Sequence, residues 1–319
     1  MQKLLNEQEP AIRTDGLRKV YKSQNKESVE ALRGLNINIP RGAFFGLLGP
    51  NGAGKSTFIN ILAGLVNRTS GNAKICGYDT INDMRMARLS IGVVPQELVL
   101  DPFFTAREAL DVQAGYYGLK ESERRTEKIL EAVGLSDQAD AYARSLSGGM
   151  RRRLMVAKAL VHNPPVVILD EPTAGVDVEL RQQLWAYLQA LNEAGTTIVL
   201  TTHYLEEAEA LCDRIAIIYE GSLVACDETP ALLAPLDKKE ILIRIEQAIE
   251  VIPKELNHLK CELLAPNELL IYYKRSQSDI SKILDLIKNL GINILDITTK
   301  EADLEDAFLH LTRSARDKI

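Results

Sequence analysis

Residues 49–57 read Gly49-Pro-Asn-Gly-Ala-Gly54-Lys55-Ser56-Thr57 and form the most informative motif of the chain. It follows the apolar run 43–48 and leads into the helical pattern of residues 56–62, the context in which such a motif binds phosphate. Glycines let backbone N–H groups turn around phosphate oxygens, Lys55 would neutralise the outer phosphates, and the Ser56 hydroxyl would offer a ligand to Mg²⁺. The predicted nucleotide-contact residues are Gly49, Pro50, Asn51, Gly52, Ala53, Gly54, Lys55, Ser56 and Thr57.

The composition around this stretch is that of an ordinary globular protein of about two domains, with 319 residues, 46% hydrophobic and 26% charged. The net charge of −6 disfavours general binding to nucleic acid or anionic lipid. The four cysteines form no CxxC pair, which argues against a zinc or redox motif. No apolar run approaches roughly 18 residues and the N-terminus lacks a signal-peptide core, so we expect a cytosolic protein.

The chain from residue 10 to about residue 230 alternates short β-branched runs with helical segments and glycine turns. Residues 43–48 and 166–169 are continuously apolar, as expected of strands buried on both faces of a sheet. We therefore predict an α/β fold with a mainly parallel sheet, of the P-loop nucleotide-binding type.

A helical insert is expected between those two strands, at residues 103–145. Thr105-Ala-Arg-Glu108 has the form of a capping box, and residues 121–133 are charged on one face and apolar on the other. We predict a nucleotide-binding domain over residues 1–235, with a helical subdomain at about 97–160.

A second, small α+β domain is predicted for residues 236–319, because Pro230 and Pro235 mark a change in pattern. The expected elements are strands at 241–245, 268–273 and 292–297, a helix at 280–290 with Gly291 as its C-cap, and a tail helix. The order is β-β-α-β-α. This region carries no glycine-rich loop, no paired carboxylates at a strand end and no metal-ligand cluster, so we expect it to perform no chemistry.

Two adjacent carboxylates, Asp170 and Glu171, end the apolar run 166–169. Ligands of open α/β sheets bind at the carboxyl ends of the strands, and successive residues there point in different directions. Asp170 can hold Mg²⁺ while Glu171 reaches a water in line with the γ-phosphate. The alternative is that the two residues are an ordinary acidic pair on the surface. The phosphate-binding motif earlier in the chain favours the first interpretation.

A second glycine segment, Leu146-Ser147-Gly148-Gly149-Met150, begins another helix. Ser147 is a natural N-cap, and the glycines expose backbone N–H groups that can bind an anion. One nucleotide does not need two such sites. Their presence on one chain suggests that ATP lies between two copies, each of which supplies one site.

With these motifs in order, residues 11–225 resemble the ATP-binding-cassette (ABC) ATPases. The resemblance implies roles for four further residues. Tyr21 corresponds to the aromatic side chain that stacks on adenine, Gln96 to the glutamine that contacts Mg²⁺ and water, His203 to the switch histidine, and Asp177 to the loop that faces the second subunit. Each alone has a simpler interpretation: a half-buried strand aromatic, a solvated turn residue, a structural histidine and a cap for the helix 178–191.

The segment LSGGMRRRL is similar to that of the type-2 exporter branch, which includes drug, polysaccharide and daunorubicin-resistance-like ATPases. The segment 302–311 also resembles the C-terminal tail of that branch. Met150 stands where the commonest signature has glutamine, a change that leaves Ser147, Gly148 and Gly149 intact. Arg151 to Arg153 are interpreted as a helix displaying arginines beside a nucleotide site or a partner rather than as a nucleic-acid patch.

The resemblance implies an ATPase that binds ATP and Mg²⁺, acts as a homodimer and drives a separate permease with about six transmembrane helices. It places the chain on the cytoplasmic face of the inner or plasma membrane, with membrane contact only through the permease and no nucleic acid partner. Translation factors and DNA-repair ATPases are the alternatives. The first normally carry two cassettes, and the second need a long insertion or cysteine pairs, none of which is seen here.

Two surfaces have open interpretations. Residues 95–108, with Phe103 and Phe104, are either a permease-docking surface or part of the subdomain core. The tail helix carries Leu304, Phe308 and Leu311 on one face, for contact with a partner or for packing within the chain.

Overall fold

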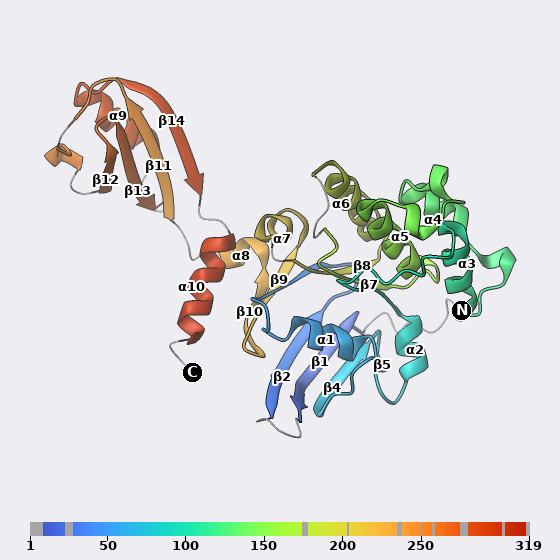
Figure 1. Cartoon of the computed structure of the whole chain (residues 1–319). Helices are drawn as coiled ribbons and strands as arrows, with labels where there is room; N and C mark the ends of the chain where they lie inside the picture. The colour runs from blue at the N-terminus through green and yellow to red at the C-terminus, as the bar shows by residue number, and fades with distance from the viewer. Residues whose placement is uncertain are drawn as a thin grey trace. The chain divides into compact units, whose positions relative to one another are not determined.

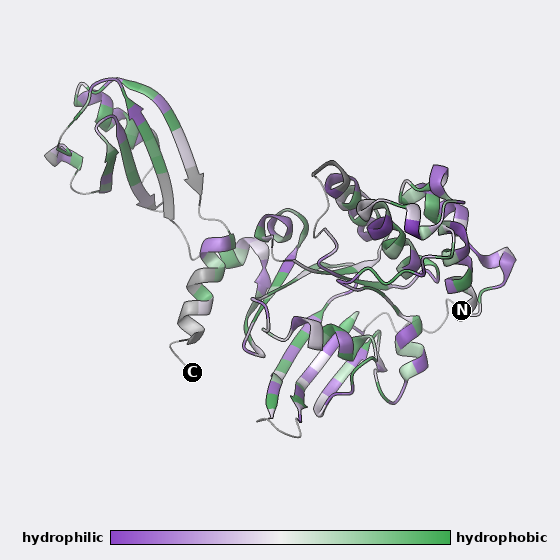
Figure 2. Cartoon of the chain, viewed as in Figure 1, coloured by the Kyte–Doolittle hydropathy of each residue, from purple (hydrophilic) through white to green (hydrophobic). Residues whose placement is uncertain are grey.

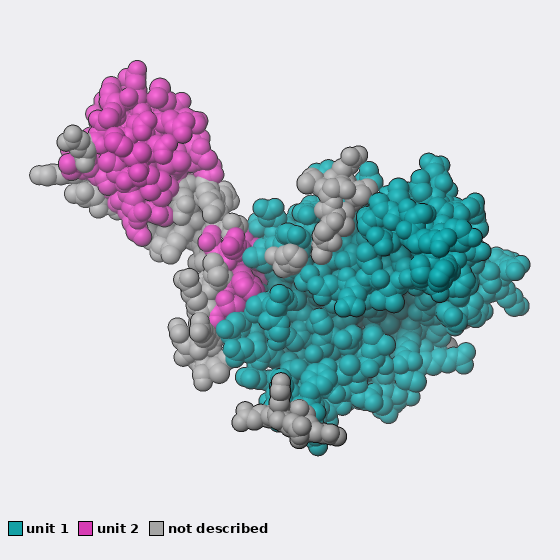
Figure 3. Space-filling model, in the orientation of Figure 1, with its two compact units in different colours: residues 1–229, 319 teal, residues 230–318 magenta. Residues whose placement is uncertain are grey.

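The computed structural model describes residues 9–22, 28–173, 178–202, 204–234, 238–249, 251–256, 259–274, 280–301 and 304–316. The chain divides into two compact units, residues 1–229 and residues 230–318, which Figure 3 colours separately.

The main sheet of the first unit has six strands in the order β10-β9-β3-β8-β7-β6 (Figure 1). The five strands from β9 to β6 are parallel, and β10 pairs antiparallel with β9. The strands are β3 (Phe44–Leu48), β6 (Ile91–Val94), β7 (Val166–Asp170), β8 (Thr197–Thr201), β9 (Arg214–Tyr219) and β10 (Ser222–Glu228). Every residue of β3, β7 and β8 is buried, so the predicted mainly parallel sheet covered on both faces is confirmed.

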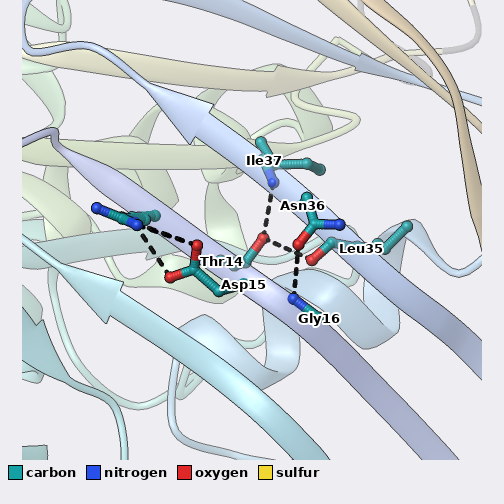
Figure 4. A network of polar contacts seen from close by, with 7 residues as sticks. Thr14, Asp15, Gly16, Leu35, Asn36 and Ile37 are labelled. Carbon is teal, nitrogen blue, oxygen red and sulfur yellow. Dashed lines mark hydrogen bonds and ion pairs between the residues drawn. The ribbon is translucent and has the colours of Figure 1, made fainter.

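A second sheet of four antiparallel strands, in the order β2-β1-β4-β5, was not separated from the first by the sequence pattern. Its strands are β1 (Ile12–Tyr21), β2 (Val29–Ile39), β4 (Ser70–Ile75) and β5 (Tyr78–Asp79). Irregular pairing between β1 and β2 breaks the alternation that sequence reasoning uses. Side chains secure this register: Thr14 Oγ1 donates to Leu35 O at 3.2 Å, and Gly16 N donates to Asn36 Oδ1 at 2.7 Å (Figure 4).

The helices of the first unit fall into two groups. The helices outside the insert are α1 (Lys55–Leu62), α2 (Met84–Leu89), α6 (Val178–Glu193) and α7 (Leu205–Leu211). The insert contains α3 (Ala106–Tyr116), α4 (Thr126–Ala132) and α5 (Gly148–Leu160), which share a core that includes Leu110, Leu130 and Leu154. The capping box of Thr105 and Glu108 at the start of α3 is confirmed.

The helix predicted over residues 121–133 is interrupted. A short 3-10 turn, Glu121–Glu123, precedes α4, and Arg124 has an extended backbone. The Lys120 amide donates to the Glu123 carboxylate at 3.0 Å, and the Thr126 hydroxyl donates to Asp111 on α3 at 2.5 Å. These contacts fix a turn and a new helix start where the amphipathic pattern indicated one helix.

The second unit is an antiparallel sheet of order β12-β13-β11-β14 with hydrophobic stretches along its strands (Figure 2). Its elements are α8 (Thr229–Leu233, which begins at the boundary), β11 (Lys238–Ile245), β12 (Lys260–Ala265), β13 (Glu268–Lys274), α9 (Ile280–Asn289), β14 (Ile294–Glu301) and α10 (Leu304–Arg316). Ile243, Ile271 and Ile287 belong to its core. Gly291 has φ 75°, as predicted for a residue that ends a helix.

The predicted order β-β-α-β-α omitted β12. That strand lies at the edge of the sheet, and its residues alternate between exposed and half-buried positions, so it lacks a strong hydrophobic signal. On α10, Leu304 and Ala307 are buried while Phe308 and Leu311 are half-buried. In the part of the chain that the structure describes, no helix has the length and apolar character that crossing a bilayer requires.

Candidate functional site

The glycine-rich loop of residues 49–57 runs from the end of β3 into the first turn of α1, at the carboxyl edge of the parallel sheet. Gly49 must be glycine, because a Cβ there would lie 2.3 Å from the Ile218 carbonyl oxygen. Gly54 has φ 109°, and a Cβ there would lie 2.6 Å from the Ala31 carbonyl oxygen. Close packing against β2 and β9 therefore restricts the shape of the loop, while its residues 50–52 are exposed.

Lys55 is the first residue of α1 and is only 7% exposed. Its Nζ donates to the carbonyl oxygens of Gly49 at 2.6 Å and Pro50 at 3.2 Å, so the ammonium group is held against its own loop. Burial lowers the pKa of Lys55, while the nearby charges of Glu171 and Asp170 act in the opposite direction. The loop thus holds a desolvated cation facing two carboxylates, an arrangement suited to a phosphate chain.

The two predicted carboxylates lie at the end of β7, two strands from β3. Asp170 is 8% exposed, and its Oδ1 accepts a hydrogen bond from Thr201 Oγ1 at 2.5 Å across the β7–β8 pair. Glu171 leaves the strand with φ 48°, a left-handed conformation that is rare for residues other than glycine. The Thr201 carbonyl and hydroxyl oxygens each accept from the Glu171 amide at 3.1 Å.

Gln96 meets Glu171 directly. Gln96 follows β6, and its Nε2 donates to Glu171 Oε2 at 3.0 Å. The structure thus brings together Gln96, Asp170 and Glu171 from the ends of two adjacent strands. The side chains of these three residues, one amide and two carboxylates, can bind a water molecule and a cation.

Two of the three arginines after the second glycine segment, Arg152 and Arg153, make contacts within the chain that their predicted display on the helix surface did not include. Arg152 is not displayed but 5% exposed, and it donates to the carbonyls of Pro95, Gln96 and Glu171. Arg153 is half-buried and donates to the carbonyls of Val133 and Gly134. Hydropathy alone gave no sign that Arg152 is buried, since only its partners offset the cost of burying a charge.

The second glycine segment lies at the start of α5. Ser147 is the N-cap, and its Oγ accepts from the Met150 amide at 3.2 Å. Ser147 and Gly148 are exposed, and Gly149 is half-buried. An exposed helix start of this kind is open to an anion presented by a second molecule.

Tyr21 is the last residue of β1, 40% exposed and opposite Val29 on β2. Ala31, two residues along β2, is the residue whose carbonyl faces Gly54, so Tyr21 lies near the side of the phosphate loop. The Lys19 ammonium lies 4.7 Å from the centre of the Tyr21 ring. Asp177 and His203 lie outside the described residues.

Sequence reasoning also missed Glu207, a buried carboxylate on α7 that is 1% exposed. It accepts from the hydroxyls of Thr173 at 2.5 Å and Thr202 at 2.7 Å, the described residues that precede positions 174 and 203. From the sequence alone, an acidic residue beside other acidic residues in a helix is expected to be exposed to solvent. The available signal was the two threonines that closely follow β7 and β8.

Comparison with known proteins adds a family to this geometry. Residues 32–174 match the family model described as "ABC transporter". The linearmycin resistance ATP-binding protein LnrL of Bacillus subtilis is 36% identical, over 96% of this chain and 100% of its own length. The Nod factor export ATP-binding protein I of Ralstonia nicotianae is 37% identical, over 97% of this chain and 96% of its own.

Solved structures agree with the first unit. The ATP-binding cassette MJ0796, in a dimeric post-hydrolysis state with ADP and Pi, aligns with a TM-score of 0.63 and 30% identity. The alignment covers 68% of this chain and 98% of that one. The cbiO1 subunit of Clostridium perfringens, from the cbiONQ transporter complex, gives a TM-score of 0.62 at 28% identity, over 71% of this chain and 91% of its own.

Proposed function

This chain belongs to the ATP-binding proteins of ABC transporters, and from that premise we propose that it hydrolyses MgATP to drive export through a separate membrane permease. The observation that carries the proposal is the hydrogen bond between Gln96 and Glu171 beside Asp170, at the same sheet edge as the Lys55 loop. Export is favoured because two full-length relatives are named for linearmycin resistance and Nod factor export.

ATP binding is assigned to the loop 49–57 and to Tyr21. Lys55 is drawn from the Gly49 and Pro50 carbonyls toward the phosphates, whose charge replaces those weaker acceptors. Tyr21 stacks on the base, a role that its exposed ring permits.

The oxygen donors near the phosphate loop fit Mg²⁺, which prefers hard oxygen ligands. Ser56 offers an exposed hydroxyl, Asp170 a carboxylate anchored by Thr201, and Gln96 an amide oxygen. We assign these three residues to the cation, which when bound would neutralise charge on the phosphates.

Glu171 is the proposed general base. It accepts a proton from the water that attacks the γ-phosphate, while Gln96 orients the carboxylate and the water. Asp177 and His203 complete this assignment, His203 contacting the γ-phosphate and Asp177 facing the second subunit. Glu207 supports the threonines next to both segments.

The active form is proposed to be a homodimer, with Ser147, Gly148 and Gly149 of one copy facing the ATP bound by the other. Two observations support it: the exposed helix start, and the similar cassette MJ0796, whose structure is dimeric. The N–H groups at the start of α5 then contribute to the γ-phosphate site.

The permease is proposed to dock at residues 95–108 and to carry about six transmembrane helices. Phe103 is 72% exposed and Phe104 36%, and neither belongs to the subdomain core, which favours a docking surface over core packing. The Arg144 guanidinium lies 5.9 Å from the centre of the Phe103 ring. The chain would thus work on the cytoplasmic face of the inner or plasma membrane, bound only through the permease and without nucleic acid.

Residues 236–319 are proposed as an accessory domain that affects dimerisation, regulation or permease pairing and not chemistry. The second unit has its own core. Deleting the residues after Leu236 is expected to leave ATP affinity unchanged and to weaken permease co-purification. Lost ATP affinity in a still-folded protein would contradict this assignment.

The decisive experiment is Glu171→Gln in the full chain, purified with its permease. We expect ATP binding to persist and hydrolysis to fall by at least about 100-fold, because an amide can hydrogen-bond water but cannot act as its base. Gel filtration with ATP should show a stable dimer. Glu121→Gln, on an exposed turn of the insert, is the control and should retain full activity.

Normal turnover by Glu171→Gln would contradict the proposed mechanism. If no membrane protein co-purifies with the chain, and translation or DNA-repair factors do so instead, the result would favour a non-transport ABC ATPase.

A further inference from the structure

Arg152 is a buried cation in the second turn of α5, the helix that begins after Ser147 and is called the signature helix. Its Nη1 donates to the carbonyl oxygens of Pro95 at 3.0 Å and Gln96 at 2.9 Å, and its Nη2 donates to the carbonyl of Glu171 at 3.2 Å. One planar guanidinium therefore bridges two loops that follow β6 and β7. Only a forked side chain with several fixed donors can serve acceptors on both loops at once.

The two loops are those that carry the proposed base and its orienting amide. Through its side chain, Gln96 also bonds the Glu171 carboxylate. Arg152 thus holds the backbone of both partners in that side-chain contact, and it comes from a helix whose first turn is the exposed Ser147 cap.

The backbone of Glu171 shows why such support is needed. Its φ of 48° is unfavourable for a residue with a Cβ and persists only when neighbours enforce it. Thr201 holds the Glu171 amide from one side, and Arg152 holds its carbonyl from the other. The conformation that turns the chain out of β7 is therefore fixed at both peptide groups.

The adjacent Arg153 makes a natural comparison. It lies on the same helix and also donates to two backbone carbonyls, but these belong to Val133 and Gly134 within the helical insert. Arg153 ties α5 to its own subdomain, whereas Arg152 ties α5 to the catalytic edge of the sheet.

We propose that Arg152 is a positioning residue that couples the signature helix to the proposed base, by holding the Gln96 loop and the Glu171 turn in one hydrogen-bonded unit. This inference rests on the proposed function of Glu171. A shift of α5 when its first turn engages ATP on a second copy is transmitted through Arg152 to the residues that handle the attacking water. Arg152 acts on the rate of hydrolysis and contacts no substrate itself.

The test compares Arg152→Gln, Arg152→Lys and the control Arg153→Gln in the full chain with its permease. Arg152→Gln is expected to lower kcat about 100-fold and to change KM and the Kd for ATP by less than about 3-fold, because a small misplacement of a base affects the transition state alone. Arg152→Lys keeps the charge but not the fork, and should lose about 10-fold in kcat. Arg153→Gln should keep kcat within about 3-fold of the original protein.

A double variant separates positioning from general structural damage. If Arg152 acts through Glu171, Arg152→Gln should cost little further activity in a Glu171→Gln background. Structural damage would instead reduce the fraction of chains that bind ATP and add to the Glu171→Gln loss. If Arg152→Gln does not fold, the same comparison is made with Arg152→Lys.

Three results would overturn the inference: kcat of both Arg152 variants within about 3-fold of the original protein, KM rising as much as kcat falls, or additive losses in the double variant. Normal hydrolysis by Glu171→Gln would instead overturn the proposed function. An inactive Glu171→Gln together with fully active Arg152 variants would overturn this inference alone.

Discussion

The phosphate loop and the carboxylate turn lie at the same edge of one sheet but are held in different ways. In the loop, the Lys55 ammonium bonds carbonyls only five and six residues away in the chain. In the turn, Glu171 bonds residues that are 19, 30 and 75 positions away, namely Arg152, Thr201 and Gln96. The loop carries its chemistry within a short motif, whereas the turn depends on three distant segments.

This difference separates binding from rate. A change in the loop removes a direct ligand or its shape, so ATP should be lost. A change around the turn leaves the phosphate ligands in place and displaces the base, so hydrolysis should slow while ATP remains bound. The following predictions test that separation.

The largest effect is expected for Lys55→Ala in the loop. The outer phosphates lose their main neutralising group, and we expect ATP turnover to fall by at least about 100-fold together with ATP affinity. Radiolabelled ATP binding and phosphate release measure the two quantities. Lys74→Ala on the exposed face of β4 is the control. Full ATP affinity in Lys55→Ala would contradict the assignment of ATP binding to the loop and of the hydrolysis rate to the turn.

The shape of the loop should matter next. Gly49→Ala places a Cβ 2.3 Å from the Ile218 carbonyl, so the loop must move, and ATP affinity is expected to fall about 30-fold. Gly52→Ala has open space and only the cost of φ 81°, about 1 kcal/mol, so its loss should be smaller. Isothermal titration with ATP measures both.

Gly118→Ala supplies the matched control, with φ 75° and open space in the helical insert. It should lose stability without losing ATP affinity. Equal ATP losses for Gly49→Ala and Gly118→Ala would show that general destabilisation, and not the close approach of the loop to β9, is responsible.

At the turn, Thr201→Val removes the hydroxyl that bonds Asp170 and the Glu171 amide but keeps the shape of the side chain. We expect kcat to fall about 10-fold with ATP affinity within about 3-fold, and stability to fall by about 1–3 kcal/mol. Thr197→Val at the opposite end of β8 is the control, because its buried hydroxyl accepts from the Gly42 amide, away from the turn. Equal kcat losses in both variants would contradict a local effect.

The comparison also explains how far the sequence predicts this molecule. The loop 49–57, the buried strands and the Ser147 cap each have a pattern contained in a short stretch of sequence, so these patterns predict them. The ABC family assignment is confirmed by the full-length relatives. Arg152 and Glu207 were not found, because the carbonyls and hydroxyls that offset their burial lie in segments that follow β6, β7 and β8, far away in the sequence. The edge strand β12 and the irregular β1–β2 pair escaped for a related reason, since neither has the regular alternation of a half-buried strand.

The smallest effect on ATP chemistry is expected from a long-range contact away from both regions. The His162 ring stacks on Tyr117 at 3.7 Å between ring centres, and its Nε2–H donates to the Ile91 carbonyl at 3.1 Å. Burial lowers the pKa of His162 to about 4. Because the unfolded chain binds the proton near the ordinary pKa of about 6.5, stability should fall as the pH drops from 6.5 toward 4, by at most about 3 kcal/mol.

Urea denaturation at pH 7.5, 6, 5 and 4.5 measures this loss, with His162→Phe as the comparison because phenylalanine keeps a ring against Tyr117 but does not titrate. The variant should be less stable at pH 7.5, where it lacks the Ile91 hydrogen bond, and should lose less stability on acidification. Its KM and kcat at pH 7.5 should match those of the original protein, because the partners of the His162 ring, Tyr117 and the Ile91 carbonyl, lie outside both the loop and the turn. Identical pH dependence in the two proteins would mean that other groups cause the acid sensitivity. A lowered kcat in the variant would mean that His162, just after α5, also helps to position the residues of the turn.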